Sequence, residues 1–247
     1  MALGGPETGW RRRYRTMLLL VPMLAHGPAR AEDDPVRTVL FGSLDAGAAT
    51  FLTTGAKVGL DRVDREGVAG LASLGAGVRF ERGGPAPGRT APTVVRTTWI
   101  GALTGGYQLF REWGVAALFA GPEVAGEALA GPGGLRTLPA RYGLRVHGEL
   151  WARPSEDTLT TATVILGSAR GDAYGRLSWG TRIWETYLGP EAALYGDHTG
   201  YRKWSFGVHA TDFAIGRFGL RASAGLQDDT GPSGLAPYLS LAAWTPW

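Results

Sequence analysis

The sequence predicts an all-β protein, a single antiparallel β-barrel of the outer-membrane type with about twelve strands, in a range of about 10–14. Three observations support this fold class. An export-type segment precedes the rest of the chain, apolar residues then recur at every second position, and the faces between them carry arginine and glycine. Strands of this kind match a membrane barrel, where one face of each strand meets lipid and the other meets the lumen.

The N-terminal segment has the three parts of a secretory signal peptide. Arg11, Arg12, Arg13 and Arg15 form a basic region, residues 17–25 (MLLLVPMLA) are apolar, and an A-x-A site ends at Ala31. The apolar run is shorter than the roughly 20 residues that a membrane-spanning helix needs. We therefore expect residues 1–31 to be a signal peptide and residues 32–247 to form one β-barrel domain.

Removal of that segment changes the charge of the protein. Residues 1–31 hold five arginines and one glutamate, a net charge of +4, so a chain of formal net charge +3 is left at about −1. The mature chain then lacks the basic surface that nucleic-acid binding requires. It also contains no cysteine, so packing and hydrogen bonds must hold the fold without disulfides.

Period-2 alternation runs through the rest of the chain. Within residues 68–80, for example, Val68, Leu74 and Phe80 share one face of a strand, while Ser73 and Arg79 lie on the other. The frequent glycines weaken any helical alternative, by roughly 1 kcal/mol each. We expect strands near residues 37–47, 49–61, 67–81, 96–109, 113–125, 140–152, 157–169, 172–185, 187–197, 201–213, 216–227 and 235–246.

The connections between these strands differ in length. Most are short and contain Gly, Asp or Pro, as turns do. Residues 82–95 and 126–139 are longer, and their glycine and proline content predicts irregular structure. The motif Gly-Pro-Glu occurs twice, at 121–123 and 189–191. Proline inside a sheet favours edges, strand starts or bulges, so a bulge is expected at each motif.

The segment RYGLRVHGELWARP, at 141–154, poses the question of which face points outward. Arg145, His147 and Glu149 alternate with Leu144 and Val146. A soluble β-sandwich or internal-ligand barrel would expose the charged face, whereas a membrane barrel turns it inward. The last strand, in which Leu239, Leu241 and Trp247 share a face and Trp244 does not, favours the membrane barrel. So do aromatics near strand ends, which suit interface girdles: Trp113, Trp151, Trp184, Tyr187, Tyr195, Tyr201, Trp204 and Trp247.

We therefore expect Tyr142, Leu144, Val146 and Leu150 to face lipid, and the charged residues to form a polar network inside the barrel. The residues expected in this network are Glu123, Arg145, His147, Glu149, Arg176, Arg182, Glu191, Lys203, His209, Arg217 and Arg221. No cofactor or metal is indicated. His147 with Glu149 could also be a metal or acid–base site, and His198 with Ser168 or Ser178 could serve a hydrolase, although no G-x-S-x-G motif is present.

Four stretches of the chain resemble the cellulose biosynthesis protein BcsS family: residues 40–59, 97–123, 148–182 and 187–213. The resemblance implies an exported outer-membrane protein associated with bacterial cellulose production, and it assigns no catalytic or binding residue. The expected function is a non-catalytic accessory role through docking or support of glucan export. Its expected partners are outer-membrane lipid, other cellulose synthase or export components, and glucan. A membrane-embedded lipid or polysaccharide hydrolase and a soluble glucan-binding β-domain are the alternatives.

Overall fold

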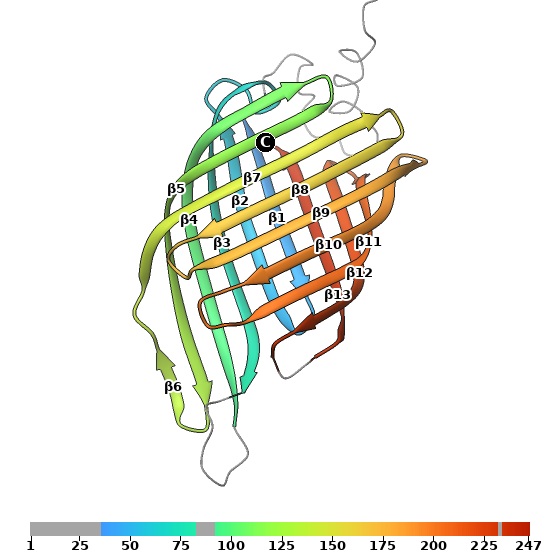
Figure 1. Ribbon diagram of the computed structural model, residues 1–247. Coiled ribbons are helices and arrows are strands. Elements are labelled where there is room, and N and C mark those ends of the chain that lie inside the picture. The colour runs from blue at the N-terminus through green and yellow to red at the C-terminus, as the bar shows by residue number, and fades with distance from the viewer. Residues whose placement is uncertain (1–35, 83–91, 232–233) are drawn as a thin grey trace, which may run out of the picture.

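The computed structural model describes residues 36–82, 92–231 and 234–247. This part of the chain forms antiparallel strands and no helix (Figure 1). The expected signal peptide lies outside the described residues. The strands are β1 (Thr38–Ala46), β2 (Ala49–Gly59), β3 (Gly67–Arg82), β4 (Thr93–Arg111), β5 (Gly114–Gly131), β6 (Gly134–Thr137), β7 (Arg141–Ser155), β8 (Thr158–Gly167), β9 (Asp172–Ile183), β10 (Thr186–Gly196), β11 (Arg202–Ile215), β12 (Phe218–Asp229) and β13 (Ala236–Pro246).

Twelve of these strands close into a barrel, which confirms the predicted fold class. Around the barrel the order is β4-β3-β2-β1-β13-β12-β11-β10-β9-β8-β7-β5, and β5 pairs again with β4. The first and last strands meet with Val39 opposite Pro246, so the two ends of the chain seal the sheet. Closure removes the unpaired edges that an open sheet would leave. The remaining strand, β6, pairs only with the end of β5.

The two ends of the barrel differ in their connections. We call the end at which β1 begins and β13 ends the terminal end, and the opposite end the loop end. Two-residue turns join β4–β5, β7–β8, β9–β10 and β11–β12 at the terminal end, and residues 60–66 form a longer connection between β2 and β3 there. At the loop end most of the connections are longer, among them residues 168–171 and 197–201. Short turns at one end and longer loops at the other are typical of outer-membrane barrels.

Residues 126–139 correct the sequence prediction. We expected irregular structure there, but β5 continues to Gly131 and β6 forms a hairpin with it. In Figure 1 these strands and the start of β4 reach beyond their neighbours at the loop end. Glycine and proline indicated irregularity, but the ladder to β4 holds this segment extended, with Val95 opposite Ala130.

The two Gly-Pro-Glu motifs also differ from the expectation of a bulge. The register between β4 and β5 is the same on both sides of Pro122, with Ala102 opposite Glu123 and Gly105 opposite Ala120. The β9–β10 register is likewise unchanged across Pro190. The ladders are only interrupted there, because proline has no N–H to donate. The preceding glycines allow close approach: a Cβ on Gly189 would lie 2.1 Å from the carbonyl oxygen of Trp179.

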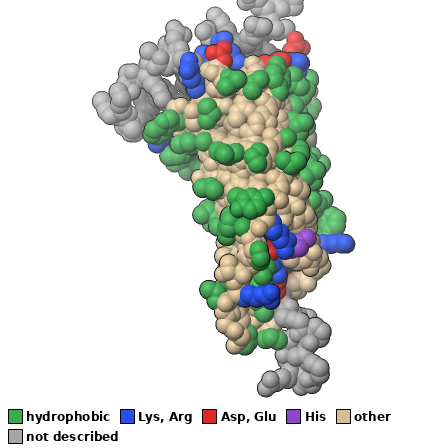
Figure 2. All heavy atoms as spheres, turned by 90° about the vertical axis from the view of Figure 1, so that its left-hand side faces the viewer, with side chains coloured by type: hydrophobic (Ala, Val, Ile, Leu, Met, Phe, Trp, Pro, Cys, Tyr) green, Lys and Arg blue, Asp and Glu red, His purple; other side chains and the backbone are tan. Residues whose placement is uncertain are grey.

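The barrel is apolar outside and polar inside. Side chains exposed on the outer wall include Leu74, Leu103, Leu118, Phe206 and Val208. Figure 2 shows hydrophobic side chains across the middle of one side and charged ones mainly toward the two ends. Within the described residues, no helix is long and apolar enough to cross a membrane.

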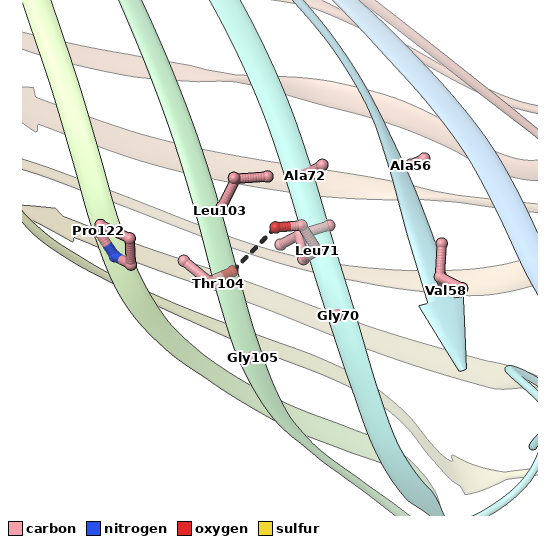
Figure 3. Close-up of a pocket in the computed structure, with 9 residues that line it drawn as sticks. All are labelled: Ala56, Val58, Gly70, Leu71, Ala72, Leu103, Thr104, Gly105 and Pro122. Atoms are coloured by element: carbon pink, nitrogen blue, oxygen red, sulfur yellow. Dashed lines mark hydrogen bonds between the residues drawn. The ribbon is translucent and has the colours of Figure 1, made fainter. Parts of the chain in front are cut away.

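A shallow groove of about 440 Å³ runs over β2, β3, β4 and β5 on this outer wall (Figure 3). Small residues such as Gly70, Ala72 and Gly105 leave the space, and Val58, Leu103 and Pro122 border it. Its lining is apolar apart from Thr104, which donates a hydrogen bond to the Leu71 carbonyl oxygen. The groove therefore offers no catalytic group.

Four of the eight aromatic residues expected in the interface girdles point outward, and the other four do not. Trp113, Trp184, Trp204 and Trp247 are exposed. The other four aromatics instead contact groups in the lumen: Trp151, Tyr187, Tyr195 and Tyr201. Trp151, Tyr187 and Tyr195 point inward because each shares a face with the charged residues on its strand, whereas Tyr201 lies in the connection just before β11.

Candidate functional site

The strand 141–155 answers the question of direction. Tyr142 and Leu144 are exposed, at 81% and 66% of their surface, on the outer wall. Arg145, His147 and Glu149 lie instead on the inner face. Arg145 contacts Glu123 of the neighbouring strand β5, His147 contacts Glu149 on its own strand, and Glu149 contacts Lys57 of β2 across the interior. The lumen is therefore the place where the chain gathers its charged and titratable side chains, and it is the candidate functional site.

The first lumen group joins β7 to β2. The Lys57 ammonium donates to the Glu149 carboxylate at 2.6 Å, and the His147 Nε2 atom lies 3.3 Å from the same carboxylate. Three strands stand between β2 and β7 along the shorter arc of the wall, so this contact crosses the lumen. Phe119, which is fully buried, lies below the Lys57 ammonium and meets the His147 ring edge-on.

A second group surrounds Glu191 of the second Gly-Pro-Glu motif. Arg221 forms an ion pair with Glu191, and the hydroxyls of Ser223 and Tyr238 donate to the same carboxylate at 3.2 and 3.3 Å. Arg221 also donates to Thr161 at 3.0 Å. The group thus links strands β8, β10, β12 and β13. A buried carboxylate is tolerated here because several donors satisfy it.

Glu123 of the first motif has a similar place on the other side. It accepts hydrogen bonds from Arg145 at 3.2 Å and from the backbone N–H of Ala169 at 2.8 Å. The second contact ties the β8–β9 connection to the inner wall. Each Gly-Pro-Glu motif therefore delivers one carboxylate into the lumen.

The densest ion-pair group closes the loop end. The Asp197 carboxylate, directly after β10, accepts from Arg79 of β3 at 2.6 Å and from Arg170 of the β8–β9 connection at 3.1 Å. Arg170 also contacts Glu127 of β5 at 2.8 Å, and Arg79 contacts Glu81. Five strands separate β3 from β10 in each direction around the barrel, so the Arg79–Asp197 pair joins opposite walls.

The electrostatics of this group follow from its geometry. Burial alone would raise the pKa of Asp197, but hydrogen bonds from Arg79 and Thr199 and the charges of Arg79 and Arg170 lower that pKa to about 2. The Asp197 side chain is fully buried, and because its pKa is lowered in this way it is an anion at neutral pH. Arg79 also lies over the Tyr201 ring, 4.2 Å from its centre.

Sequence reasoning placed Arg79 on a polar face but did not select it, and it missed Glu127, Arg170 and Asp197. Glu127 lies in a segment that we expected to be irregular. Arg170 lies in a connection, where alternation carries no information, and Asp197, which we counted as the last residue of a strand, lies just beyond β10. The only sequence signal was two charged residues in otherwise short turns.

Near the terminal end, charged and aromatic residues meet. Arg153 of β7 donates to Asp212 of β11 at 3.1 Å and to the Tyr187 hydroxyl at 3.4 Å. The rings of Trp151 and Trp244 contact each other edge-to-face, with centres 5.6 Å apart. Since β7 and β13 have five strands between them on each side, this ring contact also joins opposite walls.

The remaining predicted residues occupy separate places. His209 is buried, with Nδ1 2.7 Å from the Thr211 hydroxyl and Nε2 3.2 Å from the Trp179 carbonyl oxygen. Arg176 interacts electrostatically with Glu191, and Lys203 with Asp45 and Asp229. Arg182 is exposed at the terminal end, 5.7 Å from the centre of the Tyr187 ring.

Arg217 does not belong to the lumen. It is exposed in the β11–β12 turn, where its guanidinium lies 5.4 and 5.9 Å from the ring centres of Phe218 and Trp247. Alternation placed it inside because we counted it in the strand, but β12 begins one residue later.

The alternative catalytic groups do not come together. His198 contacts Arg141 at 2.7 Å. The Ser168 hydroxyl accepts from the Leu144 N–H, and Ser178 is bonded to Thr161. Among the hydrogen bonds of the described residues none joins a histidine to a serine, and in the same part of the chain no three His, Asp or Glu side chains form a group that could hold a metal ion.

Comparisons with known proteins agree with the sequence resemblance. The family model described as "Cellulose biosynthesis protein BcsS" matches residues 39–246. The search of curated proteins gives no match.

Similar solved structures include two autotransporter domains and a porin. The transport unit of AIDA-I from Escherichia coli is 11% identical, covers 99% of both chains and has a TM-score of 0.37. The β domain of the Bordetella autotransporter Brka is 17% identical, covers 87% of this chain and all of that one, and has a TM-score of 0.40. A mutant Rh. blastica porin is 9% identical, covers 85% of this chain and 99% of the porin chain, and has a TM-score of 0.27.

Proposed function

Because the chain belongs to the cellulose biosynthesis protein BcsS family, we propose that it is a non-catalytic outer-membrane accessory protein of bacterial cellulose production. It acts by docking to other components of the synthesis and export machinery, or by supporting glucan export. Its partners are outer-membrane lipid, those components and the glucan chain.

The outer wall supports the membrane placement. Large apolar side chains are exposed on most strands around the barrel, from Leu52 on β2 to Leu239 on β13. In water, a wall this apolar would cost about 25 cal/mol for each Å² of exposed apolar surface. In a bilayer the same side chains meet lipid, and the short-turn terminal end faces the periplasm.

The observation that carries the docking role is that side chains from opposite walls meet inside the barrel. The Arg79–Asp197 ion pair does so at the loop end, and the Trp151–Trp244 ring contact does so near the terminal end. The Lys57–Glu149 pair crosses the interior between them. An open channel for a polysaccharide needs a continuous gap, so the lumen filling favours interaction with partners over conduction.

Deletion of the gene in a cellulose-producing strain, followed by complementation, tests this role. We expect lower extracellular cellulose output, restored by the full-length chain, with the protein in the outer-membrane fraction and shifted in gel mobility on heating. Planar-bilayer recordings of the refolded protein should show no stable open state. Recovery in the soluble fraction without detergent would refute the membrane barrel. Unchanged cellulose output would refute the accessory role.

A further inference from the structure

Residues at the terminal end of the lumen combine an ion pair with two tryptophan rings. We propose that Trp151, Trp244, Arg153, Asp212 and Tyr187 form a binding site for a glucosyl unit of a β-1,4-linked glucan at this mouth of the barrel. This inference rests on the proposed function, since it names the ligand that the lumen contacts there.

The aromatic pair provides the apolar part of the site. In an edge-to-face contact the ring that contributes its edge keeps its faces uncovered by the partner ring. Both tryptophans are half-buried. The rings of β-linked glucose carry their hydroxyls around the edge and C–H groups on both faces, so they stack on flat aromatic surfaces. The Trp151–Trp244 pair therefore presents the type of surface that a glucosyl ring fits.

The backbone of β12 sets the orientation of Trp244. A Cβ on Gly219 would lie 2.4 Å from the indole Nε1 of Trp244, so the ring rests directly against this glycine. Gly219 is paired with Trp244 across the β12–β13 ladder. A larger residue at 219 would push the indole out of its place. The ring position is thus fixed by the sheet itself, as a preorganised site requires.

Asp212 provides a second, independent observation. It has a positive φ of 69°, and the β11–β12 register shifts between Thr211 and Phe213. A residue other than glycine seldom adopts this conformation, and such a position together with a bulge often marks a place where a side chain is re-aimed for function. Here the bulge turns the Asp212 carboxylate inward toward Arg153, at 3.1 Å.

Together these groups complete the chemistry of a site for an uncharged sugar. The carboxylate and the guanidinium are paired with each other, and both can exchange part of that contact for sugar hydroxyls. Tyr187 is buried, and its hydroxyl accepts a hydrogen bond from Arg153 at 3.4 Å, so it positions the guanidinium without contacting the sugar itself. Apolar walls with a few placed polar groups are typical of small-molecule sites. All five residues lie near the terminal end of the barrel. In the proposed orientation this mouth faces the periplasm, where a nascent glucan arrives.

Isothermal titration of the folded barrel in detergent with cellotetraose tests the proposal, and maltotetraose, which curves because it is α-linked, is the control sugar. We expect cellotetraose to bind, maltotetraose to bind more weakly, and Trp151→Ala and Trp244→Ala to weaken cellotetraose binding about tenfold or more. The matched control is Trp204→Ala, on the outer wall. Trp151→Phe serves if the alanine variant does not fold, as judged by heat-modifiable mobility, and should still weaken binding.

The proposal is overturned if the wild-type chain binds no cellotetraose, if both sugars bind equally, or if Trp204→Ala weakens binding as much as Trp151→Ala. Such a result leaves the accessory role intact if deletion of the gene still lowers cellulose output. Conversely, cellotetraose binding with unchanged output would refute the accessory role and keep the site.

Discussion

The Asp197 ion pairs at the loop end allow a quantitative prediction for Asp197→Asn. Removing one partner of a buried pair costs about 3–5 kcal/mol when the remaining charge has no other partner. Here Arg79 keeps Glu81 and Arg170 keeps Glu127. We therefore expect a smaller decrease in the free energy of unfolding, about 2–3 kcal/mol at about pH 7.

The same pair predicts a dependence on pH. The pKa of Asp197 is lowered from 3.8 to about 2 in the folded protein. A lowered carboxyl pKa stabilises the fold above the unfolded pKa, and the stabilisation is lost as the pH falls from about 4 to about 2. Allowing for screening by water at the loop end, the lowered pKa of Asp197 contributes about 1–2 kcal/mol to the free energy of unfolding. Since the Asn variant lacks it, the difference between variant and wild type should narrow over this interval.

Urea unfolding of the barrel in lipid vesicles, followed by gel mobility at several pH values, measures both quantities. Asp228→Asn is the matched control because Asp228 lies close to the same end of the barrel but is exposed. If Asp197→Asn and Asp228→Asn lower the free energy of unfolding equally, or if their difference does not change below about pH 4, the account of this ion-pair group is wrong.

Three further changes test other parts of the structure. Glu149→Leu should impair folding or lower the free energy of unfolding by about 3 kcal/mol, because it leaves the partly buried Lys57 ammonium without its carboxylate. Normal assembly with lost cellulose output would instead indicate a functional site. Gly189→Ala should slow or prevent assembly, since its Cβ would lie 2.1 Å from a β9 carbonyl oxygen. The control variant Gly105→Ala should assemble normally, because a Cβ at that position meets open space. Equal yields of folded barrel from the two variants on refolding would contradict this prediction. Trp184→Asn should leave the free energy of unfolding in detergent unchanged or raise it by up to about 1 kcal/mol, because this exposed residue has a positive φ that asparagine tolerates better. A marked decrease in the free energy of unfolding, measured in urea, would contradict the prediction.

Alternation predicts the barrel well because it depends only on backbone geometry. All twelve barrel strands lie where the period-2 pattern indicates, and β3, for example, begins at Gly67 as predicted. The same rule already placed Trp151 on the face of Arg145, so its position inside the lumen could have been inferred from parity. Composition misled us at that point, because aromatic residues near strand ends also suit a lipid interface.

The loop end could not be predicted in this way. Arg170 and Asp197 reach their partners through turns, and no periodicity says where a turn folds. Their partners lie across the lumen, 118 residues apart for Arg79 and Asp197, and only the closed strand order brings them together. Pairings of this kind depend on the circumference of the barrel, which the sequence does not state.

The distribution of charge along the lumen bears on how the protein works. At the loop end the Asp197, Arg79 and Arg170 side chains are buried and mutually paired, so they hold the connections 168–171 and 197–201 against the inner wall. At the terminal end the paired groups are accompanied by half-buried tryptophans and a strained aspartate, Asp212. Ion pairs that fix a loop are a structural arrangement, whereas aromatic rings with an accessible surface beside a strained polar residue are suited to a ligand. Side chains that close the loop end, together with the binding site proposed at the terminal end, support the proposed accessory role over a conduit for glucan.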